Sequence, residues 1–325
     1  MVNVTPMALN RPSIVAGPQP DHIGTLMQDR HPSIFFDPDW AHPKYYGWTR
    51  KDIRSGIHVL LKSVGPLRRA LVLTSGRSAE EVGAALRGSG VVDARTEVIL
   101  HDFDTAAEAD RTILGKRFIR ARDDQRLLNT ATFVIDVTQP EAGLWKNLGP
   151  KGRNAVRKAT DEGRVVAFAD LPGPELGKFF EFYSVIAKRA HLQIPDRGLI
   201  ERMHRDGAMI CASCSTREGE VEAANLIYLC GDFGFYMYGA TCAEPGIGVG
   251  QLIQWETIKY LREAGRRTYD LGGVSSLDPA NGIFRFKKGL GGTFVPLGAE
   301  YVFRPAAVVG AHALKRRVRS LLGRG

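Results

Sequence analysis

The feature that most constrains the fold of this sequence is a short apolar helix near the C-terminus that includes a lysine. Asp278 and Pro279 predict its start, because an aspartate side chain accepts a free first-turn amide and the fixed φ of proline suits the first turn. Glycines at positions 289, 291 and 292 predict its end. The sequence therefore predicts a helix that runs from about residue 279 to residue 289.

Lys287 lies on the apolar side of this predicted helix. At about 100° per residue it shares an arc with apolar side chains, whereas Arg285 and Lys288 fall on the other side. The apolar members of the arc are Ile283, Phe284, Phe286 and Leu290. An unpaired buried ammonium is costly, so this side chain must snorkel, pair, or reach into a cleft. A cation that serves the helix dipole in the last turn is the alternative interpretation.

Composition and charge limit the class of protein. The chain has 325 residues, of which 44% are hydrophobic and 24% charged, a globular balance at a length that suits two domains. Lysine and arginine exceed aspartate and glutamate by 44 − 35 = 9, and the pI is near 9.5. This balance favours an anionic partner such as RNA, a diphosphate or a membrane surface, with solvated surface charge as the alternative.

The sequence predicts a cytoplasmic protein without stable membrane insertion and without a metal site. No window approaches the ~20 apolar residues of a membrane span, and the first residues lack a charged leader followed by an apolar core. Cys211 and Cys214 form a C-x-x-C, but they fall in a predicted strand, where they would point to opposite faces. They are therefore expected to be buried and reduced.

Short strands and helices alternate along the chain, which predicts an α+β fold. A helix begins after Ser78, whose side chain is expected to cap it, and an amphipathic helix contains Leu176 and Tyr183. The predicted strands are 58–64, 70–75, 96–100, 132–137, 208–215, 221–229, 233–240 and 268–271.

The strand at 233–240 alternates aromatic residues in a way that predicts two distinct faces. Phe233, Phe235 and Met237 are expected on one face, with Tyr236 and Tyr238 on the other. Two phenols on one face could line a substrate slot, or form an aromatic edge of the core.

Two basic segments are candidate RNA contacts. The helical run that contains Leu144, Trp145 and Val156 is basic on its opposite faces, and the segment after Arg304 predicts a basic amphipathic helix. The tail could bind an RNA backbone or a membrane surface, or only cap the domain; we favour RNA. The candidate RNA contacts are Lys151, Arg153, Arg157, Lys158, Lys315, Arg316 and Arg317.

Several ordered motifs resemble the FemABX family of peptidyl transferases. They are D-L-G-G-V at 270–274, G-I-F-R-F-K-K-G-L-G-G at 282–292, Y-G-A at 238–240, and the passage that contains L-W-K-N-L and K-G-R-N-A-V-R-K-A. The likeness covers most of residues 30–303 and implies two GNAT-like (acyl-CoA N-acyltransferase-like) domains in tandem. The expected organisation is a flexible leader at 1–19, an N-terminal domain at 20–162, and a C-terminal domain at 163–325 with its basic helix.

The resemblance also implies site residues. Lys287, in the Phe286-Lys287 pair, would stabilise the transition state, while Phe286 would contact the substrate and Arg189 would bind the acceptor. Trp40 and Lys44 match a W-x-x-x-K spacing at which the family contacts an acceptor diphosphate. A tyrosine usual in the family is replaced here by Gln193, a departure that argues against the family's usual UDP-linked acceptor. Asp270 at a strand end is a candidate proton relay, with a purely structural aspartate as the alternative.

The implied function is transfer of an amino acid from aminoacyl-tRNA to a small amine or peptide acceptor, with formation of an amide and without a cofactor. An acyl-CoA N-acyltransferase with a coenzyme A thioester as donor is the first alternative, suggested by Gly246, Gly248 and Gly250 before a predicted helix. Glu244 and Pro245 stand where a basic residue is usual, which argues against a bound pyrophosphate. A non-catalytic RNA-binding or membrane-associated protein on the same fold is the second alternative. The amino acid, the acceptor and the oligomeric state are not indicated by the sequence.

Overall fold

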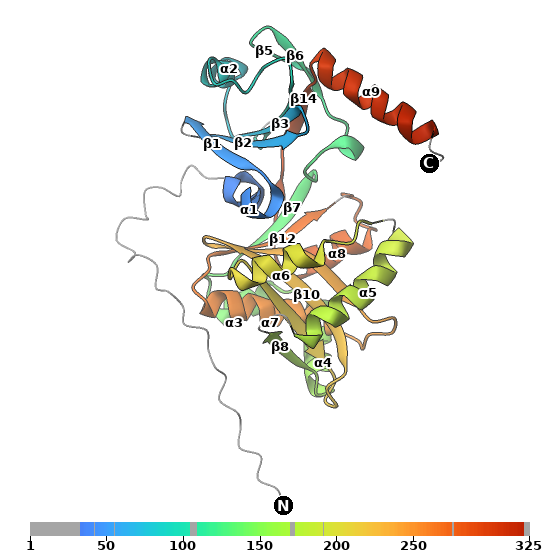
Figure 1. Ribbon diagram of the computed structural model, residues 1–325. Coiled ribbons are helices and arrows are strands. Elements are labelled where there is room, and N and C mark those ends of the chain that lie inside the picture. The colour runs from blue at the N-terminus through green and yellow to red at the C-terminus, as the bar shows by residue number, and fades with distance from the viewer. Residues whose placement is uncertain are drawn as a thin grey trace, which may run out of the picture. The chain divides into compact units, whose positions relative to one another are not determined.

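The computed structural model describes residues 33–41, 43–54, 56–104, 109–169, 173–190, 192–274 and 276–321. The predicted leader at 1–19 lies outside these ranges. The described residues form two seven-stranded sheets with helices packed against them (Figure 1). The α+β class predicted from the sequence is confirmed.

The first sheet contains a parallel pair, β3 with β4, inside an otherwise antiparallel arrangement. Helix α2, Ala79–Leu86, buries Val82 and Leu86 against this sheet. Ser78 caps the helix as predicted, because its hydroxyl accepts a bond from the Glu81 amide at 3.1 Å while the Glu81 carboxylate accepts one from the Ser78 amide at 2.8 Å. In order across the sheet the strands are β1 (Thr49–Arg54), β2 (Ile57–Val64), β3 (Leu67–Thr74), β4 (Thr96–Asp102), β14 (Ala299–Phe303), β6 (Lys116–Arg120) and β5 (Arg111–Ile113).

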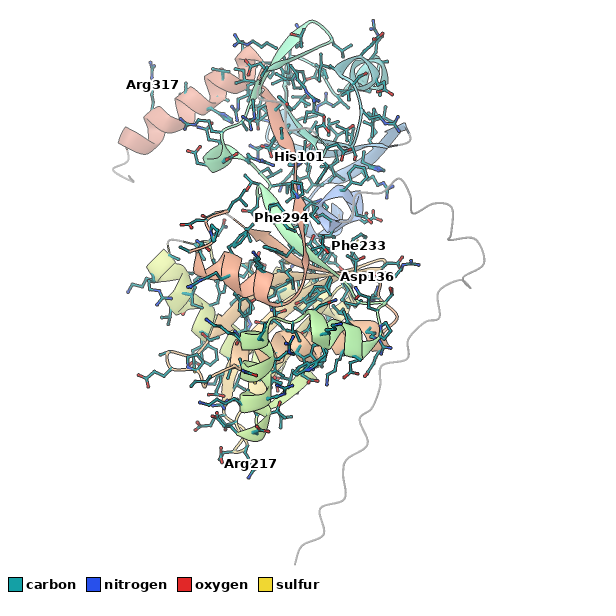
Figure 2. The ribbon with its side chains drawn as sticks, turned by 180° about the vertical axis from the view of Figure 1, so that it is seen from behind. His101, Asp136, Arg217, Phe233, Phe294 and Arg317 are labelled. Atoms are coloured by element: carbon teal, nitrogen blue, oxygen red, sulfur yellow. The ribbon has the colours of Figure 1, made fainter. Side chains whose placement is uncertain are left out.

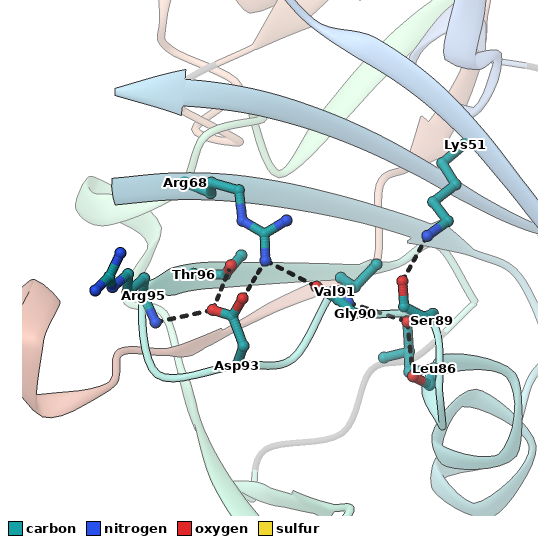
Figure 3. Close-up of polar contacts among 9 residues, drawn as sticks. All are labelled: Lys51, Arg68, Leu86, Ser89, Gly90, Val91, Asp93, Arg95 and Thr96. Atoms are coloured by element: carbon teal, nitrogen blue, oxygen red, sulfur yellow. Dashed lines mark hydrogen bonds and ion pairs between the residues drawn. The ribbon is translucent and has the colours of Figure 1, made fainter. Parts of the chain in front are cut away.

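The turn that leads from α2 into β4 is organised by Asp93 (Figure 3). One carboxylate oxygen accepts bonds from the Arg95 amide at 2.8 Å and the Thr96 hydroxyl at 2.7 Å, and the other meets the guanidinium of Arg68. Because Arg68 begins the β3 side of the parallel ladder opposite Thr96, this turn fixes the register in which β4 enters the sheet.

The second sheet contains the meander expected from the sequence, β9 to β10 to β11, and continues through the parallel pair β11 and β12. Cys211 and Cys214 are buried free thiols on opposite faces of β9, as predicted. In order the strands are β13 (Thr293–Pro296), β7 (Ala131–Asp136), β12 (Thr268–Val274), β11 (Phe233–Thr241), β10 (Val221–Cys230), β9 (Met209–Ser215) and β8 (Val165–Ala169).

Helices cover both faces of the second sheet. Helix α5 buries Leu176 and Phe179 in one apolar cluster, and α7 buries Leu252 and Ile258 in another. Besides α2, the helical elements of the described residues, α5 and α7 included, are η1 (Ile34–Phe36), η2 (Pro38–Ala41), α1 (Pro43–Tyr46), η3 (Asp123–Gln125), α3 (Glu141–Asn147), α4 (Pro150–Asp161), α5 (Pro174–Ala190), α6 (Arg197–Arg205), α7 (Val249–Glu263), α8 (Gly282–Gly289) and α9 (Ala306–Leu321).

The two sheets do not divide at the domain boundary predicted between residues 162 and 163. Strand β7, which precedes it, lies between β13 and β12 in the second sheet, while β14, which follows it, lies between β4 and β6 in the first (Figure 1). Each sheet thus contains a strand from the other part of the sequence. The boundary stays a prediction, but it does not separate the strands of one sheet from those of the other.

Helix α9 confirms that the basic tail is helical. Val308 is buried, whereas 64% of the surface of Leu314 is exposed. Within the described ranges, all helices fall short of the length and apolar character that a bilayer crossing requires.

Candidate functional site

Helix α8 begins later than the sequence predicted. Its N-cap is Asn281, whose side-chain oxygen accepts bonds from the amides of Ile283 and Phe284 at 3.0 and 3.1 Å. The predicted start at Asp278 is wrong, because that carboxylate accepts the Ala280 amide at 2.8 Å within the preceding turn. The helix ends at Gly289 as predicted.

The buried side of α8 includes Lys287. This residue is only 7% exposed and lies between the buried Phe284 and Leu290, as its place in the apolar arc predicted. Ile283, which was expected in the same arc, is 56% exposed. The later helix start explains this error, because Ile283 belongs to the first turn, at the open end of the helix.

The Lys287 ammonium is held by two backbone carbonyls. Its Nζ donates to the oxygens of Gly272 and Gly273, each at 2.9 Å. These two bonds use two of the three N–H groups of the ammonium. Burial lowers the pKa of Lys287 from its ordinary 10.5 to about 8, although the nearby Asp270 carboxylate opposes this shift. The side chain is therefore mostly protonated at pH 7, with one proton available.

The D-L-G-G motif creates the carbonyl pair. The ladder between β12 and β7 shifts register between Asp270 and Gly273, and Gly272 adopts a φ of +78° that favours glycine. A Cβ at Gly272 would lie 2.9 Å from the Tyr236 carbonyl oxygen and 3.4 Å from the Lys287 Nζ. The irregular backbone is thus what turns two carbonyls toward the lysine.

Asp270 is fully buried beneath this turn. Its carboxylate accepts bonds from the Ser33 hydroxyl at 2.8 Å, the Ile34 amide at 3.3 Å, the Thr132 hydroxyl at 2.5 Å and the Gly272 amide at 2.9 Å. Burial raises the pKa of Asp270, while these donors and the Lys287 charge act in the opposite direction. The geometry is that of a residue that positions η1, β7 and β12. Its role as a proton relay stays a prediction.

Strands β11 and β12 diverge where Lys287 lies. They pair from Phe233 with Thr268 to Phe235 with Asp270, after which β11 continues beside β10 and β12 beside β7. The β11 residues 235–239 are all partly exposed, although β11 is a central strand, whereas the facing stretch 225–228 of β10 is buried. Solvent therefore reaches this stretch of β11, which includes Tyr236, the tyrosine whose ring lies nearest the lysine.

The two tyrosines of β11 lie on opposite faces, which corrects the sequence prediction. Tyr238 pairs with Leu226 but Tyr236 pairs with Ile227, so Met237 is an extra residue in a β-bulge. Burial raises the pKa of Tyr236 to about 12, and the centre of its ring lies 6.0 Å from the Lys287 Nζ. Tyr238 instead packs on the α5 side, 5.6 Å from the ring of Tyr183.

The other substrate-binding candidates are more dispersed. Phe286 is partly buried beside Gly250 at the start of α7. Trp40 in η2 packs edge-on against Phe35, with ring centres 5.7 Å apart. Arg189 and Gln193 are exposed at the end of α5 and in the loop that follows. The backbone of Lys44 lies in α1, but its side chain is outside the described part.

The basic residues of α4 differ in how many contacts they make with other residues of the fold. Lys151 is exposed, whereas Arg153 donates to the carbonyls of Lys146 and Leu148 and so completes the end of α3. The Arg157 guanidinium lies 5.4 Å from the Trp145 ring centre. The remaining α4 candidate, Lys158, lies 3.9 Å from the Glu162 carboxylate. Of the tail candidates, Arg317 is exposed on α9 (Figure 2), while the side chains of Lys315 and Arg316 are not described.

The glycine-rich turn before α7 is filled by its neighbours. A Cβ at Gly248 would lie 2.0 Å from the Ala155 carbonyl oxygen of α4, and the Gly246 amide donates to Glu222 at 2.8 Å. Glu222 in turn accepts a bond from Arg164 at 2.6 Å. Close helix packing therefore explains these glycines without a bound pyrophosphate.

Sequence reasoning missed the partners of the central residues. Thr132 and Ser33, which donate to Asp270, lie far from it in the chain, and no local pattern marks them. The only sequence signal for the carbonyls of Gly272 and Gly273 is indirect, because two adjacent glycines in a strand suggest an irregular backbone.

The C-terminal part of the chain matches a known family model. A family model described as an acetyltransferase (GNAT) domain matches residues 150–288, which include Tyr236, Asp270 and Lys287. No curated protein matches the sequence.

Several solved structures share the fold at low identity. The crystal structure of FemX has a TM-score of 0.62 and 17% identity, over 82% of this chain and 91% of that chain. A conserved protein of unknown function from Bacteroides thetaiotaomicron VPI-5482 has a TM-score of 0.54 and 11% identity, over 84% and 91%. The C-terminal domain (DUF2156) of a proposed lysylphosphatidylglycerol synthetase from Agrobacterium fabrum has a TM-score of 0.50 and 13% identity, over 84% and 88%. Together the two sheets, the family model and the likeness to FemX show a fold of two GNAT-like domains.

Proposed function

We propose that this protein is an N-acyltransferase that moves an amino acid from the ester of an aminoacyl-tRNA to an amine acceptor and so forms an amide. The acceptor would be a peptidoglycan precursor peptide or a small natural-product amine. The observation that carries the proposal is the Lys287 ammonium, which is buried, aimed by two carbonyls and adjacent to a solvent-reached divergence of two parallel strands. Ligands favour the carboxyl ends of parallel strands in open sheets.

The chemistry asks little of the protein beyond orientation and charge. The neutral amine attacks the ester carbonyl carbon, a C–N bond forms, and the carbonyl oxygen becomes negative. The C–O bond to the ribose then breaks, and the proton lost by the amine ends on the ribose hydroxyl. Lys287 can stabilise the oxyanion with its remaining N–H, and such preorganised charge is effective where water is scarce. In this scheme the Tyr236 ring forms one side of the site next to Lys287, and the partly exposed Phe286 contacts the substrate.

Acyl transfer in general has support from the GNAT domain model over residues 150–288. That model also favours the second candidate, an N-acyltransferase that uses a coenzyme A thioester. The packing of Gly248 against Ala155, and the use of the Gly246 amide by Glu222, argue for the ester donor, because a pyrophosphate would compete with both contacts.

A transfer assay with purified protein separates the two donors. Radiolabelled aminoacyl-tRNA pools and acyl-CoA thioesters are each offered with a panel of amines, and labelled amide is quantified. We expect label in product from aminoacyl-tRNA, and loss of product when the pool is pretreated with ribonuclease. Product that forms only from a thioester, or that survives ribonuclease, would contradict the ester donor and support the coenzyme A alternative.

The pH dependence of transfer should report the protonation of Lys287. Because the pKa of this lysine is lowered to about 8, the fraction that carries the ammonium decreases as pH rises through that value. With hydroxylamine, an acceptor that is already neutral at pH 7, kcat/KM should fall above about pH 8. The residual rate of Lys287→Met should lack this fall. A wild-type profile that still rises at pH 9 would exclude the ammonium as the stabilising group.

A further inference from the structure

An open hollow beside α8 is not used by the proposed chemistry. It has a volume of about 270 Å³. It lies where α8 meets the edge strand β13 of the second sheet, and Figure 2 labels Phe294 on that strand. Lys287 does not line it. The lining residues are Phe133, Leu277, Phe284, Lys288 and Phe294.

The walls of the hollow are aromatic, and part of them is accessible. The Phe133 ring centre lies 5.3 Å from that of Phe284 and 5.6 Å from that of Phe294, with both pairs edge to face. Phe133 is 2% exposed and forms the interior of the group, whereas Phe294 is 42% and Leu277 50% exposed. A ligand can therefore contact an aromatic ring without displacing the core.

The rim of the hollow is cationic. Lys288 lines it, and Arg285 lies nearly one turn earlier on the same side of α8; both side chains are exposed. None of the lining residues in the described part of the chain carries a carboxylate. A ligand that joins an apolar flat group to an anionic group would satisfy both the walls and the rim.

The size of the hollow favours a single ring over a long chain. Pockets for drug-sized ligands span about 300–1,000 Å³, so a lipid acyl chain would extend well beyond this one. Nucleobases stack on aromatic side chains, and their flanking phosphates pair with lysine and arginine. We infer that this hollow binds one unpaired nucleobase near the 3′ end of an RNA, with Lys288 at a neighbouring phosphate. The inference rests on the proposed function, which supplies an RNA-linked donor.

The position of the hollow relative to Lys287 suits such a role. Lys287 and Lys288 are successive helical residues, so their side chains leave α8 about 100° apart. One strand of RNA can therefore contact Lys288 and Phe294 while the ester at its end approaches Lys287 around the same helix. The hollow would contribute to affinity for the donor and leave the oxyanion contact to Lys287.

Binding of a short RNA tests the inference without any catalytic step. The probe is a fluorescein-labelled single-stranded RNA that ends in unpaired CCA, and anisotropy measures its affinity for the full chain. Phe294→Ala should weaken binding about tenfold or more, within the range for loss of one stacked base. Lys288→Gln should weaken it less and reduce the salt dependence by about one phosphate contact. Ile119→Ala on β6 and Lys178→Gln on α5, both at exposed positions, are the matched controls and should bind as the wild type does.

Equal RNA affinity of Phe294→Ala and the wild type would overturn the inference. If the same variant also bound anionic phospholipid vesicles more weakly than the wild type, the hollow would be assigned to a lipid. Transfer from aminoacyl-tRNA that persists in Phe294→Ala with unchanged affinity would remove this inference and leave the proposed function standing. Phe294-dependent RNA binding without any transfer activity would support the hollow and remove the proposed function.

Discussion

Replacing Lys287 with methionine should lower the rate of aminoacyl transfer by about 10²- to 10³-fold, the usual loss when one preorganised oxyanion donor is removed. Methionine is apolar and close to lysine in length, so the buried site stays filled while the ammonium and its bonds to Gly272 and Gly273 are lost. The measurement is kcat for amide formation at saturating aminoacyl-tRNA. Lys178→Met, at an exposed position of α5, is the matched control and should keep the wild-type rate.

The fold should tolerate this change, which separates catalysis from stability. The lowered pKa of Lys287 means that the folded protein disfavours the charged form of this side chain by about 3 kcal/mol. Replacement by methionine removes this cost, which offsets the loss of the two hydrogen bonds. Between about pH 8 and its unfolded pKa of 10.5, folded Lys287 binds fewer protons than unfolded Lys287. The wild type should therefore gain stability over this window relative to Lys287→Met. A folded Lys287→Met protein with the wild-type rate would show that the lysine is only structural.

Replacing Asp270 with alanine should have the largest effect on folding, a decrease of about 3–5 kcal/mol in the free energy of unfolding. Its buried carboxylate accepts from two hydroxyls and two amides, and each donor left without a partner costs about 1–3 kcal/mol. Urea denaturation followed by circular dichroism measures the change. Ser33→Ala removes one of these donors and should cost about 1 kcal/mol.

Asp270→Asn tests the relay prediction at the same position. The amide keeps the shape and can donate to the Ser33 hydroxyl, so this variant should be more stable than Asp270→Ala. It cannot take up a proton. Normal transfer by a folded Asp270→Asn protein would exclude a relay at this residue, and loss of less than about 1 kcal/mol in Asp270→Ala would refute its positioning role.

Periodicity and capping rules found the elements that depend on near neighbours. The apolar arc placed Lys287 in the interior, and Ser78 caps its helix as expected. The start of α8 was predicted wrongly because Asp278 and Asn281, three residues apart, are both good N-cap residues. Which of the two caps the helix depends on how the folded helix packs.

Features that depend on distant partners could not be read from the sequence. The bulge at Met237 moves Tyr238 to the other face, and alternation alone cannot reveal an inserted residue. The glycines at 246 and 248 suggested a phosphate site, yet they are required by the approach of Ala155 and Arg164. The donors to Asp270 come from Ser33 and Thr132, and only the folded chain brings them together.

The position of β14 has a consequence for how this protein is made. The strand inserts between β4 and β6, so it closes the middle of the first sheet although it is encoded near the end of the chain. During synthesis the N-terminal sheet must wait with an unpaired β4 edge until residues 299–303 leave the ribosome. The first sheet is therefore completed only after every described strand of the second sheet has been translated.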